Sequence, residues 1–472
     1  MPAPLHFMTI ADLAKGIAAR TVSPVELTKA LIARVAALDG MTHAFIEVTA
    51  DLALAQAKKA EAEVMAGISR GPLHGVPVGL KDIIDLKGVR TTAHSHQLID
   101  NWATDDAFVT QKLKAAGAVI LGKLATHEFA MGGPSFDLPF PPARNPWNLA
   151  HFTGGSSSGS GAAVAAGYVP AALGTDTGGS IRLPAAFCGI VGMKPTYGLV
   201  SRRGVLPLSQ SLDHIGPMTW TVEDNALLMK VLAGHDRLDP ASADVPAPDF
   251  RSGLDGDVSG LKIALPRHFF AQAEGVSPEV LAAIDNAASL LAKAGAIVEE
   301  VTIPDYELFN AVGRVIMFSE AFAIHEKDYR ERPLDFGRLA FTRMILGATL
   351  SAADLTQAYR LRRELAVAVN HQLLKQYDAI LCASALARAA RFDSMSDAFP
   401  PNWPIQTMPF NVTGNPAMSM PAGFSASGLP LSVQIVGRPF DEPTVLRVGA
   451  SLEKALALTG LRPSTATLRQ AA

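Results

Sequence analysis

Hydroxyl side chains gather in two glycine-rich clusters, GGSSSGSG at 154–161 and DTGGSIR at 176–182. A serine hydroxyl attacks carbonyl carbons when a neighbouring base takes its proton. Two glycines before Ser180 let the backbone turn several N–H groups toward one point, because glycine adopts φ values that other residues avoid. Such a row of amides stabilises the oxyanion of a tetrahedral intermediate. The second cluster therefore predicts a serine nucleophile beside an oxyanion hole.

Three other interpretations of this region are weaker. A flexible linker would not carry the apolar, helix-forming run AAVAAGYVPAALG at 162–174. A phosphate-binding loop needs a lysine after its glycines, and residues 154–160 have none. The G-x-S-x-G pattern at 155–159 matches a nucleophile elbow with Ser157 as the nucleophile, but an elbow needs a strand directly before it. RNPWNLAHFTG at 144–154 has the composition of a loop, so the elbow is disfavoured and stays an alternative.

A serine nucleophile needs a base, and Lys81 is the best candidate. It lies in HGVPVGLKDIID at 74–85, where burial would disfavour the charged form and lower the pKa, so that the amine accepts a proton. Its apolar neighbours are Val76, Val78, Leu80 and Ile83. His151 and His214 remain alternatives, although each lies in a polar or turn-like stretch. Cys188 is interpreted as a small buried packing residue, because PAAFCGIVG supplies no base.

Helices and strands alternate along the chain. Helical patterns cover 23–40, 50–67, 106–117, 221–234, 277–296, 352–376 and 442–456. Strand patterns cover 76–85, 118–124, 261–266, 297–304, 377–384, 416–423 and 431–439. This alternation predicts an α/β fold with a central mixed β-sheet covered by helices on both faces.

The composition and net charge limit the classes of protein to which this chain can belong. The chain has 472 residues, 49% of them hydrophobic and 18% charged, with a formal net charge of -3. We expect one domain over 1–472, with an N-terminal helical segment at about 9–67, a catalytic core at about 70–235, the rest of the sheet and pocket helices at about 260–458, and a loose tail at 459–472. No basic field for nucleic acid, no signal peptide and no membrane span is evident, so we expect a cytoplasmic protein.

The motifs GVPVGLKD, TGGSSSGS and GTDTGGSIRLPAAFCGIVGMKPTYG strongly resemble the amidase signature family of serine hydrolases. The resemblance runs from SPVELTKALIARV to LPLSVQIVGRPFDE. It implies a triad of a serine nucleophile, a bridging serine on a cis peptide and a lysine base. Those positions here are Ser180, Ser156 and Lys81. The backbone amides of Thr177, Gly178, Gly179 and Ser180 would form the oxyanion hole, and no metal or organic cofactor is implied. We expect Asp176 and Arg182 to hold this loop as an ion pair or hydrogen-bonded anchor.

The resemblance implies hydrolysis of the carbon–nitrogen bond of amides, with esters and carbamates sharing the same carbonyl chemistry. The alternative is the glutaminase subunit of a tRNA-dependent amidotransferase. That group carries an aspartate where NWPIQTMPFN has Pro404, so we favour a free-standing amidase acting on a small molecule, as a monomer or homodimer. Ser158 also departs from the family, which usually has glycine there.

Substrate contacts are expected from the segment after EFAMG and from pocket helices near 306–325. The candidates are Phe129, Met131, Gly132, Gly133 and Trp403. These residues are mostly apolar and no charged anchor is evident, so the sequence predicts a hydrophobic, aromatic amide or carbamate as the substrate.

Overall fold

One mixed β-sheet runs through the structure, a computed structural model that describes residues 4–395 and 406–464. Its strands are β1 (Phe45–Val48), β2 (Pro77–Lys81), β3 (Val119–Leu124), β4 (Ala171–Asp176), β5 (Val191–Lys194), β6 (His214–Thr219), β7 (Lys262–Leu265), β8 (Ile297–Glu300), β9 (Ala379–Ala383), β10 (Ala417–Phe424) and β11 (Pro430–Gly437). Their order in space is β1-β3-β2-β4-β6-β5-β10-β11-β9-β7-β8. Strand β2 is parallel to β3 and β4, and β7 is parallel to β8 and β9.

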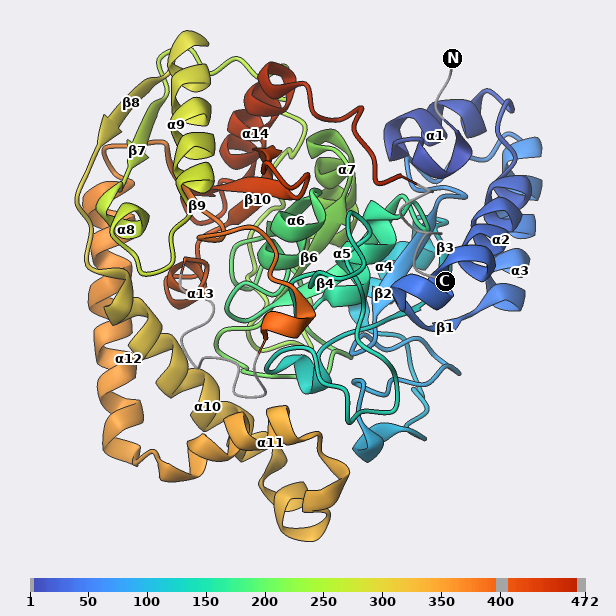
Figure 1. Cartoon of the computed structure of the whole chain (residues 1–472). Coiled ribbons are helices and arrows are strands. Elements are labelled where there is room, and N and C mark those ends of the chain that lie inside the picture. Colours follow the sequence, from blue (N-terminus) through green and yellow to red (C-terminus); the bar gives the residue numbers. More distant parts are fainter. Residues whose placement is uncertain (1–3, 396–405, 465–472) are drawn as a thin grey trace.

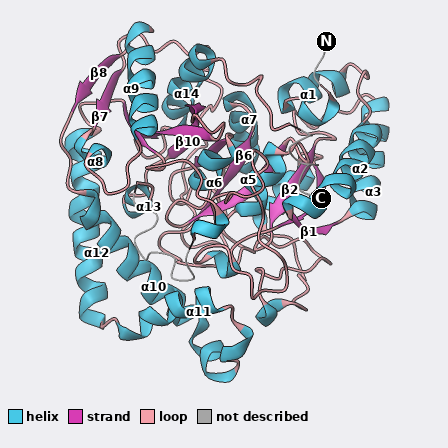
Figure 2. Ribbon diagram, viewed as in Figure 1, coloured by secondary structure: helices cyan, strands magenta, loops and turns pink. Residues whose placement is uncertain are grey.

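Helices flank the sheet, as the α/β prediction requires (Figure 1, Figure 2). They are α1 (Ile10–Ala18), α2 (Pro24–Thr42), α3 (Ala50–Met65), α4 (Phe108–Ala115), α5 (Ser158–Ala165), α6 (Arg182–Cys188), α7 (Val222–Leu232), α8 (His268–Ala271), α9 (Pro278–Lys293), α10 (Tyr306–Glu331), α11 (Arg338–Met344), α12 (Ala352–Val367), α13 (Met408–Val412) and α14 (Glu442–Leu456). Helices α1–α3 lie at the end of the sheet formed by β1–β3, and α10 packs along α12 at the opposite end (Figure 1).

Local sequence explains where the strongest elements begin and why they are buried. Ser23 caps α2 by accepting a hydrogen bond from the Glu26 N–H, and Pro24 occupies the first helical turn. Strands β2 and β3 are buried at every residue, as expected for parallel strands covered on both faces. These elements confirm the corresponding predictions.

The run at 162–174 is only partly helical, which corrects the expectation for that segment. Helix α5 ends at Ala165, and Gly167 then takes a φ of +70° that stops the helix. Residues Ala171–Asp176 form β4, between β2 and β6 in the sheet. Small, apolar residues there have no strand periodicity, so pairing on both sides decided the conformation.

Three further strands, β1, β5 and β6, carry no clear sequence signal. Strand β6 reads HIGPMT, whose glycine and proline resemble a turn. Its Gly216 lies so close to the neighbouring strand that a Cβ would be 2.0 Å from the carbonyl oxygen of Met193. The glycine therefore permits close strand packing and does not mark a turn.

The C-terminal segment is packed as far as the structure describes it, which corrects the prediction of a loose tail from residue 459. The Trp220 Nε1 donates to the Thr459 carbonyl at 3.0 Å, and the Arg462 guanidinium lies 3.5 Å from the centroid of the Trp220 ring. Residues 465–472 lie outside the described part.

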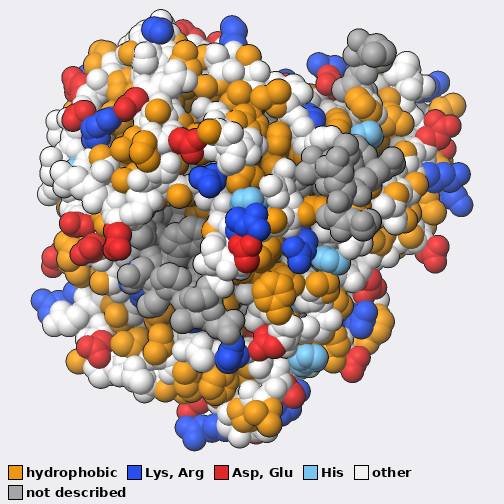
Figure 3. All heavy atoms as spheres, viewed as in Figure 1, with side chains coloured by type: hydrophobic (Ala, Val, Ile, Leu, Met, Phe, Trp, Pro, Cys, Tyr) orange, Lys and Arg blue, Asp and Glu red, His pale blue; other side chains and the backbone are white. Residues whose placement is uncertain are grey.

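Charges of both signs are interspersed on the face seen in Figure 3, in keeping with the formal net charge of -3. Among residues 4–395 and 406–464, no helix is long and apolar enough to cross a membrane.

Candidate active site

Lys81 is the last residue of β2, and its side chain is completely buried. Strand β4 runs parallel beside it and brings Thr175 to the same edge of the sheet. The Lys81 Nζ donates to Ser156 Oγ at 2.7 Å and to Thr175 Oγ1 at 2.8 Å. Both partners are uncharged hydroxyls, so neither compensates a positive charge on the lysine.

The pKa of Lys81 is lowered to about 7, chiefly because burial disfavours the ammonium form. The carboxylates of Asp213 and Asp176 act in the opposite direction and keep the pKa from falling further. Near neutral pH, a substantial fraction of the side chain is therefore a free amine that can take a proton from Ser156.

Ser156 follows Gly155 through a cis peptide bond. Its carbonyl oxygen accepts hydrogen bonds from the N–H groups of His127 at 3.0 Å and Ser158 at 2.8 Å. Helix α5 begins at Ser158, whose hydroxyl donates to the Ala125 carbonyl at 3.3 Å. The resembled family usually has glycine at this position. Here the hydrogen bond to Ala125, directly after β3, accommodates the hydroxyl of Ser158.

Ser180 lies on the turn between β4 and α6 and lines the same cavity as Ser156, together with Thr177 and Gly178. Gly179, directly before it, has a φ of +137°. A Cβ at Gly179 would be 2.1 Å from the Thr407 Oγ1, so the turn requires glycine both for its backbone conformation and for space. The structure places the two serines at one cavity and Lys81 behind Ser156.

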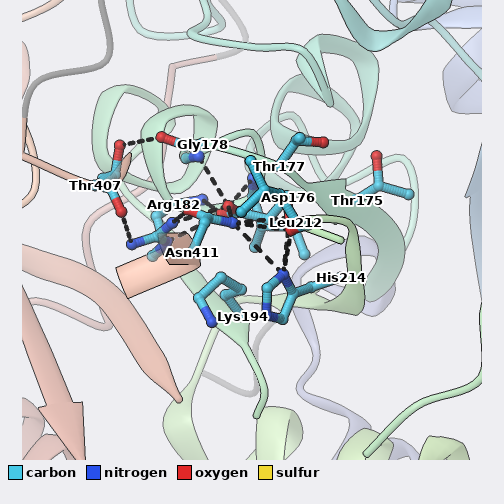
Figure 4. A network of polar contacts seen from close by, with 12 residues as sticks. Thr175, Asp176, Thr177, Gly178, Arg182, Lys194, Leu212, His214, Thr407 and Asn411 are labelled. Carbon is cyan, nitrogen blue, oxygen red and sulfur yellow. Dashed lines mark hydrogen bonds and ion pairs between the residues drawn. The ribbon is translucent and has the colours of Figure 1, made fainter. Parts of the chain in front are cut away.

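Asp176 and Arg182 form a buried ion pair, with Arg182 Nη2 2.8 Å from Asp176 Oδ1 (Figure 4). The Asp176 carboxylate also accepts from the N–H groups of Gly179 at 2.7 Å and Ile181 at 3.1 Å. Burial alone would raise the pKa of Asp176, but the Arg182 guanidinium holds it well below its usual range. The pair ties both ends of the serine turn to one carboxylate.

Helix α13 covers this anchor from a distant part of the chain, and sequence reasoning missed it. Thr407 donates to the Gly178 carbonyl at 2.6 Å, and its own carbonyl accepts from Arg182 at 2.8 Å (Figure 4). Asn411 donates to the carboxylate of Asp176 at 2.9 Å. TMPFN places a hydroxyl and an amide four residues apart, which predicts that they share a helix face, but nothing in that spacing links them to the serine turn.

Asp213, before β6, was also missed. Its carboxylate accepts from the Thr177 hydroxyl at 2.5 Å and from the N–H groups of Leu208 at 2.9 Å and Ser209 at 3.0 Å. Burial raises the pKa of Asp213 to about 6. Asp213 therefore fixes the side chain of Thr177 at the start of the serine turn.

The alternative bases lie away from the serine cavity, as far as the described lining shows. His214 is buried on β6, and its Nδ1 lies 2.7 Å from the Leu212 carbonyl (Figure 4). His151 pairs with Arg391 in an isolated β-bridge. The Cys188 thiol is buried, burial raises its pKa, and it donates to the Thr153 carbonyl.

The expected substrate contacts are only partly at this cavity. Met131 and Gly132 line it, whereas Gly133 lines a small adjoining cavity. Phe129 is buried and packs on His325, with ring centroids 4.3 Å apart. Trp403 and Pro404 lie outside the described residues.

Arg343, in α11, lines the cavity with both serines, which corrects the expectation that the pocket has no charged anchor. Burial, with Arg314 nearby, lowers its pKa to about 10, so it stays cationic at neutral pH. Sequence reasoning missed it because α11 is distant in sequence from the serine clusters.

A larger cavity of about 530 Å³ adjoins the serine cavity and shares Ala130 and Leu208 with it. Thr175 and Asp213 line this second cavity. Thr175, one of the two hydroxyl partners of Lys81, therefore lies at the wall of a second cavity whose described lining does not include Ser180. In the described residues, no group of three or more His, Cys, Asp or Glu side chains could hold a metal ion.

The comparisons with known proteins identify the family. A family profile described as Amidase matches residues 26–446, so this chain belongs to the amidase family, whose enzymes act on carbon–nitrogen bonds. It is 41% identical to the A subunit of the glutamyl-tRNA(Gln) amidotransferase of Roseiflexus castenholzii, over 96% of each chain.

Two solved structures are similar to the whole fold. One, described as an inhibitor-bound vestigial protein complex that reveals the origins of an s-triazine catabolic enzyme, has a TM-score of 0.90 and 34% identity, over 97% of this chain and 99% of that chain. A bacterial aryl acylamidase of the amidase signature family has a TM-score of 0.88 and 27% identity, over 99% of both chains. The relatives similar in sequence favour the alternative of a glutaminase subunit over a free-standing amidase.

Proposed function

We propose that this enzyme hydrolyses the carbon–nitrogen bond of a small primary amide that carries an anionic group, through an acyl-enzyme on Ser180. The main support is the 2.7 Å hydrogen bond from Lys81 to Ser156, next to a cavity that Ser156 and Ser180 line together. This arrangement matches a nucleophile with a two-step proton path to a buried base.

In the acylation half, neutral Lys81 takes the Ser156 proton while Ser156 takes that of Ser180. The Ser180 Oγ forms a bond to the amide carbon, and the carbonyl electron pair moves onto the oxygen. Backbone amides of 177–180 would hold this oxyanion. Collapse of the intermediate breaks the carbon–nitrogen bond, and the proton returns through Ser156 to the nitrogen, which leaves as ammonia.

In the deacylation half, water attacks the Ser180 ester and gives its proton to the same path. The second intermediate collapses to a carboxylic acid and free Ser180. Esters and carbamates would follow the same steps, because they pass through the same type of tetrahedral intermediate.

Arg343 supports an anionic substrate. It is a cation on the wall of the serine cavity, and a guanidinium binds carboxylates through charge-assisted hydrogen bonds. An uncharged aromatic amide would place apolar carbon against this cation. Arg343 is therefore assigned to the acyl end of the substrate.

The glutaminase subunit of an amidotransferase is the second candidate. The similarity over almost the whole length to the A subunit of such an enzyme supports it, as does Arg343, since glutamine carries a carboxylate. Pro404, at the position of the expected aspartate, is the feature against it. Glutamine hydrolysis measured with and without the other subunits of such an amidotransferase separates the two candidates: dependence on those subunits supports the second.

The acyl-enzyme is tested with a fluorophosphonate probe, intact-protein mass and peptide mapping. We expect one label, on Ser180, and none in Ser180→Ala. Ser157→Ala is the matched control and should still be labelled. A label that maps to Ser157 would instead support the nucleophile elbow, and an unlabelled wild-type protein would contradict serine chemistry.

The anionic substrate is tested with two amides of the same shape, succinamate and 4-methylpentanamide, which differ by a carboxylate in place of an isopropyl group. We expect wild type to prefer succinamate, and Arg343→Met to reduce that preference in kcat/KM by about 10- to 100-fold. Arg343→Lys, which keeps the charge but loses the planar fork, should lie between them. An unchanged preference in Arg343→Met would contradict the assignment.

A further inference from the structure

His127 lines the cavity of Ser156 and Ser180 but has no role in the proposed proton path. It lies directly before the turn at Glu128–Ala130, and only 5% of its surface is exposed. Its ring stacks on Phe152, with centroids 5.7 Å apart and planes at 17°. On another side, a Cβ on Gly155 would lie 2.0 Å from the ring, so the imidazole is held directly against the peptide that precedes Ser156.

Both ring nitrogens of His127 are buried, and neither makes a well-aligned hydrogen bond with a described residue, although the Gly132 backbone lies near the ring. The backbone N–H is used, because it donates to the Ser156 carbonyl. Buried polar atoms in native proteins are nearly always paired, and the Gly132 backbone can serve only one ring nitrogen, so at least one nitrogen still needs a hydrogen-bond partner. The ring lines the cavity shared by Ser156 and Ser180, which is where a substrate would supply one.

The imidazole is neutral. Burial lowers the pKa of His127 to about 3, and electrostatic interactions with Lys81, His94 and Arg343 lower it further, whereas a hydrogen bond with the Gly132 backbone acts in the opposite direction. A neutral imidazole has one N–H donor and one acceptor nitrogen. It therefore suits an uncharged polar group, whereas the neighbouring Arg343 suits an anion.

We infer that His127 is a specificity residue that binds an uncharged hydrogen-bonding group, such as an amide or hydroxyl, on the acyl chain of the substrate. The inference rests on the proposed function, in which ammonia is the leaving group, so every other polar group of the substrate belongs to the acyl part. His127 takes no part in the proton path. Its effect is on which acyl group is accepted.

The test compares succinamide with 4-methylpentanamide, which have the same shape but differ by an amide in place of an isopropyl group. The ratio of their kcat/KM values does not depend on the fraction of folded enzyme. We expect His127→Phe, which keeps an aromatic ring against Phe152, to reduce the ratio by about 10- to 100-fold. His127→Asn, which keeps a donor and an acceptor, should retain most of it.

The matched control is His94→Phe. His94 is a second buried histidine that lines the small adjoining cavity, and its Nε2 donates to the Phe140 carbonyl at 2.8 Å. It is absent from the described lining of the serine cavity. It should leave the ratio within about threefold of wild type. A ratio in His127→Phe equal to that in His94→Phe would overturn the inference, because the ring would then only pack.

A second measurement does not depend on the His127→Phe protein being active. In Ser180→Ala labelled with ¹⁵N-histidine, succinamide should shift the His127 ring nitrogens, and 4-methylpentanamide should not. Equal effects of the two amides would overturn the inference. Wild type that hydrolyses no amide would refute the proposed function itself, whereas active wild type with an insensitive ratio refutes only the role of His127.

Discussion

Two buried lysines lie on neighbouring strands and have different partners. Lys81 in β2 and Lys123 in β3 are both completely buried, and their strands pair in parallel. Lys123 lies 2.9 Å from the carboxylate of Asp82 and donates to Thr91 Oγ1 at 2.8 Å. Lys81 instead donates to two hydroxyls, those of Ser156 and Thr175.

We expect this difference in partners to give the two buried lysines different roles, one structural and one in the proposed proton path. A carboxylate compensates a buried ammonium, so Lys123 is part of an ion pair that stabilises the loop after β2. Hydroxyls compensate it less, so burial dominates and the pKa of Lys81 falls to about 7. In the proposed mechanism, the neighbouring partner and not burial distinguishes Lys81, the base, from Lys123, the structural lysine.

The largest expected effect is on activity. Lys81→Met should reduce kcat/KM by at least about 10³-fold, because the proton path loses its base. Lys123→Met, measured per folded enzyme by active-site titration, should stay within about tenfold of wild type. Comparable losses in the two variants would break the comparison.

The free energy of unfolding should show the reverse order, with a larger loss in Lys123→Met than in Lys81→Met. Lys123→Met leaves Asp82 as a buried carboxylate without its cation, and we expect a loss of about 3–5 kcal/mol in the free energy of unfolding. Lys81→Met removes a side chain that is costly to bury and should change it by about 1 kcal/mol or less. Urea unfolding of both variants measures this. A larger loss in Lys81→Met would show that its hydrogen bonds are structural.

The pH dependence of kcat/KM sharpens the assignment of the base. A free lysine has a pKa of about 10.4 and would be protonated at neutral pH. With a pKa lowered to about 7, Lys81 is the free amine above that pH, and activity should fall about tenfold per pH unit below it. If kcat/KM instead began to fall below a pH of about 10, or did not fall between about pH 5 and 10, the result would contradict a lysine with a lowered pKa.

The smallest expected effect is a shift, in Asp213→Asn, of the pH at which kcat/KM begins to fall on the acid side. The Asp213 carboxylate raises the pKa of Lys81 against burial, so its removal should move this acid limb to lower pH by less than about one unit. Asparagine can still accept from Thr177. The control is Glu320→Gln. The Glu320 carboxylate lines the same large cavity and accepts a hydrogen bond from Ser209, and its removal should leave the acid limb of the pH profile in place.

Much of the fold was predictable because long, periodic or wholly apolar segments have few alternatives. The cap at Ser23 and the buried run of β2 are decided by residues within a few positions of each other. Strands β4 and β6 were not predictable, since small residues, glycine and proline take a strand conformation there only between neighbours far away in the sequence.

The candidate site divides in the same way. Ser156, Ser180 and Lys81 lie in motifs specific enough to be named from the sequence, and Asp176 and Arg182 are close enough to be paired from it. Thr407, Arg343 and His127 were not found, because their relation to the serines exists only where α13, α11 and the turn after β3 meet.

The sequence by itself placed both lysines in apolar strand patterns, GVPVGLKD and AVILGKL, and predicted that Lys81 is buried. Only the tertiary structure decided which one could act as a base. The chain after β2 brings Asp82 to Lys123, and the serine turns bring Ser156 and Thr175 to Lys81. A pKa depends on the charges and dipoles within a few ångströms of the group, and chain folding, not local sequence, sets those neighbours.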